Sequence, residues 1–73
     1  MNKQKLIIKL KRARIPDYLY NLDEVGRDDE RLCLKKINDK WNVYYCERGV
    51  MTTNILFDSE DEACEFIYNR LRK

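Results

Sequence analysis

Residues 31–57 read RLCLKKINDKWNVYYCERGVMTTNILF, and this stretch decides the fold. Hydrophobic and polar side chains alternate within it in three runs, at the period of two that is typical of half-buried β-strands. The turn-forming residues Asn38-Asp39-Lys40 and Arg48-Gly49 separate these runs. We therefore predict a three-stranded antiparallel sheet, folded as a meander.

The middle run indicates which side chains face the core. Trp41, Val43 and Tyr45 fall on one face of the predicted strand, and we expect a helix to cover this apolar face. Tyr44 falls on the opposite face, so its ring is the better candidate for a surface contact.

A C-terminal helix is predicted over residues 58–72. Ser59 and Glu62 have the spacing of a capping box, in which the first residue caps the helix and the second lies three positions later. Acids fill the first turn and cations the last, as the helix dipole favours. Apolar residues recur at helical spacing in between; they are Ala63, Phe66, Ile67 and Leu71.

An N-terminal helix is predicted over residues 1–14. The segment is rich in helix-forming residue types, Leu6 and Leu10 lie one turn apart, and Pro16 marks its end. A strand remains an alternative, because Leu6, Ile8 and Leu10 also alternate along the chain.

The 73 residues are expected to form one α+β domain with a thin core. The N-terminal helix at 1–14 leads through an acidic loop at 15–30 into the sheet at 31–57. The helix at 58–72 then packs on one face of that sheet.

Charge is distributed unevenly along the chain, although the net charge is only +2. Residues 1–14 carry six cations and no acid. Residues 15–65 carry thirteen acids and six cations, a net charge of −7. Such asymmetry favours electrostatic pairing with a partner.

The residue types that most enzymes use near neutral pH are scarce. Histidine is absent, and the three cysteines Cys33, Cys46 and Cys64 lack metal-binding spacing. We therefore expect no catalytic residue, no metal, no cofactor and no enzymatic activity. No apolar run has secretory or transmembrane length, so we expect no membrane partner and a cytoplasmic protein with reduced thiols.

Tyrosines and acids predict a surface that binds another protein. Tyrosine is enriched in protein interfaces, and surrounding carboxylates speed the encounter with a basic partner. The residues chosen on this basis are Tyr18, Tyr20, Asp23, Glu24, Asp28, Asp29, Glu30 and Tyr44.

Two pieces of the chain resemble small immunity proteins of bacterial polymorphic toxin systems. They are residues 41–49 (WNVYYCERG) and residues 57–66 (FDSEDEACEF). These systems include contact-dependent growth inhibition, and the similar part spans roughly residues 16–71. The resemblance implies that the chain binds the C-terminal toxic domain of a neighbouring effector and blocks its active site. Many such toxins are nucleases with basic clefts, so the acidic loop would mimic nucleic acid. Glu47 and Arg48 match the E-R-G element, although a local ion pair is their alternative role.

Other functions remain open. Lys5, Lys9 and Arg12 lie near one helical face and suit a small nucleic-acid-binding regulator, although the acidic body opposes binding of a polyanion. A structural or adaptor subunit is a third reading. An exposed strand edge also allows pairing with a toxin or with a second copy of the chain.

Overall fold

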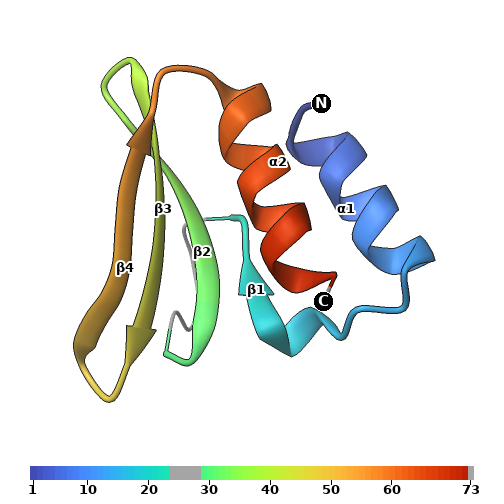
Figure 1. The fold of residues 1–73 in the computed structure, drawn as a ribbon, viewed down its shortest axis with the longest axis horizontal. Helices are drawn as coiled ribbons and strands as arrows, with labels where there is room; N and C mark the ends of the chain where they lie inside the picture. The colour runs from blue at the N-terminus through green and yellow to red at the C-terminus, as the bar shows by residue number, and fades with distance from the viewer. Residues whose placement is uncertain (24–28, 73) are drawn as a thin grey trace.

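The alternating stretch forms three long strands in a computed structural model that describes residues 1–23 and 29–72 (Figure 1). Helices begin and end the chain, as the sequence predicts. The elements are α1 (Lys3–Arg12), the short 3₁₀ helix η1 (Asp17–Leu19), β1 (Tyr20–Asn21), β2 (Arg31–Ile37), β3 (Lys40–Glu47), β4 (Val50–Phe57) and α2 (Glu60–Leu71).

The sheet has four strands in the order β1-β2-β3-β4, and it is mixed. The antiparallel pairings of β2 with β3 and of β3 with β4 confirm the meander. The fourth strand, β1, pairs parallel to β2 and places Tyr20 opposite Leu32. The prediction of three strands was therefore incomplete. β1 lies within the predicted loop at 15–30, and two residues are too few to show an alternating pattern, so no periodic signal indicated this strand.

Turn chemistry shapes both antiparallel connections. Asn38 has a φ of 56° between β2 and β3, and Asn accepts this left-handed conformation more readily than most residues. Arg48 and Gly49 have φ values of 53° and 81°, as a two-residue hairpin turn requires between twisted strands. A register shift between Tyr45 and Cys46 then introduces a bulge near the start of β4.

Both helices are capped by side chains. The Asn2 side chain accepts the Lys5 N–H at 2.9 Å, and the Ser59 Oγ accepts the Glu62 N–H at 3.2 Å. The second contact confirms the predicted capping box. The Lys3 N–H donates to Glu60 Oε2 at 2.9 Å, so the acidic first turn of α2 also satisfies a free amide of α1.

The two helices lie on the same side of the sheet, with α2 between α1 and the strands, and they run parallel to each other (Figure 1). The core lies between these layers. Leu34 and Val43 contribute from the sheet, and Ile67 contributes from α2. Leu6 and Leu10 contribute from α1. The N-terminal segment is therefore a helix that buries these two residues, and the alternative prediction of a strand was wrong. No helix in the described part of the chain is long and apolar enough to cross a membrane.

Candidate protein-binding surface

Three carboxylates meet at one end of the sheet. Asp29 and Glu30 directly precede β2, and Glu47 ends β3. The backbone holds the first two in place: the Glu30 N–H donates to the Cys46 carbonyl, and Asp29 Oδ1 accepts the Arg48 N–H at 3.0 Å. The carboxylate of Asp29 is thus fixed against the turn between β3 and β4, and the backbone of Glu30 is fixed against β3.

A shallow groove of about 420 Å³ lies beside these carboxylates. Leu19 from η1 and Tyr45 from β3 give it an apolar lining. A second hollow continues from it toward the last turn of α2 and shares Leu19, Glu30 and Tyr45. We call the first hollow the acidic groove; its lining residues are Tyr18, Leu19, Asp29, Glu30, Arg31 and Tyr45.

Tyr45 connects the apolar and acidic parts of this groove. Partial burial raises the pKa of its phenol, and the nearby carboxylates of Glu47, Glu30 and Asp29 raise the pKa further. The hydroxyl therefore stays protonated at neutral pH, and it can donate a hydrogen bond in a partly apolar setting. An apolar ring with a polar tip is typical of a binding surface.

The structure brings together half of the predicted partner-binding residues. Asp29, Glu30, Glu47 and Arg48 lie at the same end of the sheet, and Tyr18 lines the acidic groove with 62% of its surface exposed. Tyr45 and Leu19 line the groove but are not among the predicted partner-binding residues. Strand alternation had placed Tyr45 in the core, and it does pack against the core on one side.

The other predicted residues lie elsewhere. Tyr20 is only 9% exposed and belongs to the core, so its assignment to the surface was wrong. Its neighbour Leu22 is buried as well, which shows that the chain turns inward at β1. Asp23 is exposed just after β1, and its N–H donates to Asn21 Oδ1 at 3.1 Å. Glu24 and Asp28 lie outside the described residues.

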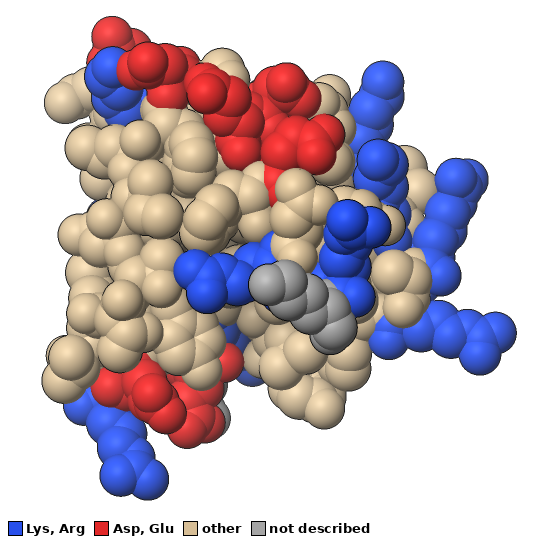
Figure 2. Space-filling view, viewed as in Figure 1, with Lys and Arg blue, Asp and Glu red and all other residues tan. Residues whose placement is uncertain are grey.

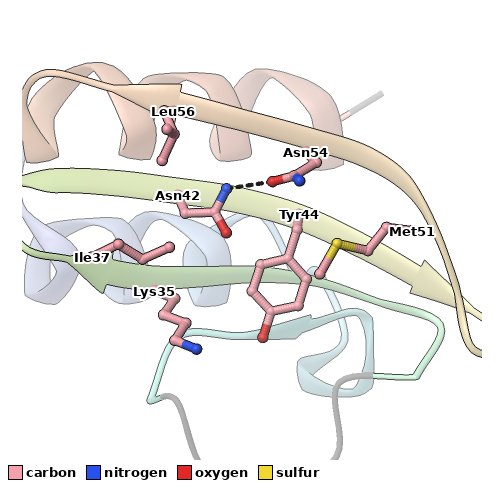
Figure 3. A pocket seen from close by; sticks show the side chains of 7 residues that line it. All are labelled: Lys35, Ile37, Asn42, Tyr44, Met51, Asn54 and Leu56. Carbon is pink, nitrogen blue, oxygen red and sulfur yellow. Dashed lines mark hydrogen bonds between the residues drawn. The ribbon is translucent and has the colours of Figure 1, made fainter.

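Tyr44 lies on the opposite face of the sheet, which no described helix covers (Figure 3). We call this surface the open face; the residues that line its shallow hollow are Lys35, Ile37, Asn42, Tyr44, Met51, Asn54 and Leu56. Asn42 is only 5% exposed, and its amide donates to Asn54 Oδ1 at 2.7 Å and to the Ile55 carbonyl at 3.1 Å. This buried amide connects β3 to β4, while exposed apolar side chains surround it.

Positive charge gathers on the opposite side of the molecule, over α1 (Figure 2). The last turns of the two parallel helices meet there, and Lys9 and Arg72 both lie over the Tyr68 ring, at 5.2 and 5.7 Å from its centroid. We call this surface the basic corner; it comprises Lys9, Lys11, Arg12, Arg70 and Arg72. The cations of α1 lie away from the acidic groove, whereas Arg70 also lines the second hollow that continues from it.

The chain matches no protein-family model, no curated protein and no solved structure. Among the described residues, no group of three or more His, Cys, Asp or Glu side chains has the arrangement needed to hold a metal ion. The three cysteines are free thiols. Burial, followed by the negative charge of Glu60, raises the pKa of Cys64 to about 11, so this thiol is a poor nucleophile at neutral pH.

Proposed function

We propose that this chain is a bacterial immunity protein that binds the toxic domain of a cognate effector and covers its active site. The observation that carries the proposal is the convergence of Asp29, Glu30 and Glu47 around a groove lined by Leu19 and Tyr45. The resemblance of residues 41–49 and 57–66 to such proteins supports the same function.

Charge explains how the acidic groove would recognise a nuclease. A nuclease cleft holds Lys and Arg side chains at positions that neutralise phosphates. The same cations form charge-assisted hydrogen bonds with carboxylates, and complementary charge accelerates association. A cleft filled by Asp29, Glu30 and Glu47 has no room for its nucleic-acid substrate.

The apolar part of the groove supplies binding energy that charge alone lacks. Tyr18 is largely exposed and carries a large ring, which suits an anchor residue in an interface. Hydrogen bonds already hold the backbone of Glu30 and the carboxylate of Asp29, so little further ordering is needed when a partner binds.

A matched pair of charge reversals tests the proposal. Glu30→Lys reverses a charge inside the acidic groove, and Glu65→Lys makes the same change on the exposed side of α2. Binding to the toxic domain encoded by the adjacent gene is measured by calorimetry, and inhibition is measured by the cleavage of labelled nucleic acid. We expect Glu30→Lys to weaken binding by at least about tenfold and to restore cleavage, while Glu65→Lys acts like the wild type. Equal effects of the two variants, or no complex at micromolar concentration, would contradict the proposal.

A nucleic-acid-binding regulator is the second candidate, and the basic corner favours it. Its cations come from the last turns of two helices, and those on α1 lie away from the acidic groove, so the repulsion expected from the acidic body is reduced over α1. Retention on DNA or RNA with a steep salt dependence, lost in the variant Lys5→Ala/Lys9→Ala/Arg12→Ala, would favour this function.

A further inference from the structure

The outer edge of β4 carries little of the protection that is usual for an edge strand, apart from the bulge near Thr52. β4 is the last strand in the sheet order, and its eight residues VMTTNILF contain no charged side chain and no proline. Natural edge strands are usually blunted by charges, by proline, by bulges or by very short length. The opposite edge follows this rule, because β1 has only two residues.

The edge of β4 is apolar as well as uncharged. Leu56 is 59% exposed on the open face, and Ile55 is 36% exposed on the other face. Figure 2 shows a broad area without charged residues over this side of the sheet, with acidic groups near both ends of the strands. Unpaired backbone groups and exposed apolar side chains therefore lie together along the same edge.

We propose that the edge of β4 pairs antiparallel with β4 of a second copy of this chain. A two-fold axis perpendicular to the sheet then joins two four-stranded sheets into one continuous sheet. The helices of both copies lie on one side of that sheet, and the two open faces lie on the other.

The bulge limits which residues can pair. It lies near Thr52, because Tyr45 pairs with Thr53 while Cys46 pairs with Met51. Side chains alternate regularly only over residues 53–57, and paired residues in an antiparallel ladder share a face. We therefore place the two-fold axis at Asn54 or Ile55. Each side chain near the axis then lies beside a side chain of the second copy that points to the same face of the sheet.

Charges at the two ends of β4 complement each other in this arrangement. The turn before β4 carries Arg48, and Asp58 directly follows the strand, where it forms an ion pair with Lys40 of β3. Antiparallel pairing places the N-terminal end of β4 in one copy beside the C-terminal end of β4 in the other. Arg48 in the turn before β4 then approaches Asp58 of the second copy, and the two-fold axis repeats this contact.

The first test compares two lysine substitutions on the open face. Leu56→Lys lies on β4 at the proposed contact, and Ile37→Lys lies on β2, away from that edge, at 40% exposure. Sedimentation velocity from micromolar to submillimolar concentration measures the monomer–dimer equilibrium, and circular dichroism checks that both variants fold. We expect a wild-type dimer whose Kd is weakened at least about tenfold by Leu56→Lys and unchanged by Ile37→Lys. A wild type that stays monomeric throughout, or equal effects of the two substitutions, would overturn the proposal.

A charge exchange tests the antiparallel arrangement. Arg48→Asp and Asp58→Arg each place like charges together across the proposed interface, so each is expected to weaken the dimer. The double variant places opposite charges together again and is expected to restore it. Absence of this rescue would overturn the pairing of the two edges in antiparallel orientation.

The dimer does not depend on the proposed binding of a toxin. The acidic groove is lined from η1, β2 and β3, whereas the proposed backbone pairing belongs to β4, and Arg48 is the one proposed dimer contact that also lies near the groove. A monomeric Leu56→Lys variant that still binds and inhibits the toxic domain would separate the two interactions.

Discussion

Cys64 shows how strongly the environment of one residue controls its chemistry. Its side chain is completely buried in α2 beside the core residues Ala63 and Ile67. Burial is the main cause of its raised pKa, and the carboxylate of Glu60 adds to the effect. The neutral thiol packs like a small apolar side chain, and the thiolate has no comparable place in the folded protein.

The stability of the protein should therefore fall in alkali. The Cys64 pKa is about 11 in the folded protein and 9.0 as its ordinary value, so its contribution is complete below pH 9 and is lost as the pH rises through about 11. Urea unfolding between neutral pH and pH 11 measures this loss. Tyr20 and Tyr45 also have raised pKa values, so they contribute to the loss of stability in alkali. The wild type is therefore compared with Cys64→Ala, and we expect the free energy of unfolding of this variant to fall less over the same pH range. Identical pH dependences would contradict the prediction.

Each helix depends on side chains at its first turn. Ser59 accepts the Glu62 N–H, and its hydroxyl also donates to Glu62 Oε1 at 3.1 Å. The next three residues are all acidic, which suits the positive end of the helix dipole. Because α1 uses Glu60 to satisfy the Lys3 amide, the start of α2 supports both helices.

Removal of the Ser59 cap should lower stability without changing the fold. We expect Ser59→Ala to reduce the free energy of unfolding by about 1 kcal/mol, since the Glu62 N–H loses its acceptor. Ser59→Asp is the control, because aspartate also caps helices well and should retain most of the stability. Urea unfolding followed by circular dichroism measures both. An aspartate variant as unstable as the alanine variant would rule out capping as the cause.

The elements with a periodic pattern were predictable from the sequence. The alternation and the two turns located β2, β3 and β4, and β3 begins at Lys40, which had been assigned to the turn before it. Periodicity carries no information about a two-residue strand, so β1 and the burial of Tyr20 became visible only in the tertiary structure. The acidic groove was predictable in part: its acids stood out in the sequence, whereas the position of Tyr45 depends on packing between separate segments.

At the scale of the whole molecule, charge is divided among separate surfaces. Acids gather at the start of α2 and at the lower end of the strands, and cations gather over α1 (Figure 2). The helix dipoles contribute to this division, because the two parallel helices place their C-terminal ends together and both ends carry cations. The edge of β4 and the open face have little charge by comparison.

The thin core should make unfolding cooperative. Leu10 on α1 is fully buried, so we expect Leu10→Ala to lower the free energy of unfolding by about 2–5 kcal/mol. Ile8 lies on the same helix but is 50% exposed, and Ile8→Ala should have a much smaller effect. Urea unfolding is followed by Trp41 fluorescence and by far-ultraviolet circular dichroism. A transition for α1 that precedes the loss of Trp41 packing would contradict a single cooperative unit.

The packing of α1 on α2 also bears on how the protein is made in the cell. α1 is synthesised before α2, on which it makes its main contacts, so Leu6 and Leu10 stay uncovered until α2 is available. The meander of β2, β3 and β4 can form earlier, because each strand pairs with the strand next to it in the sequence. During synthesis α1 therefore remains unpacked, and the core closes only once α2 has emerged from the ribosome.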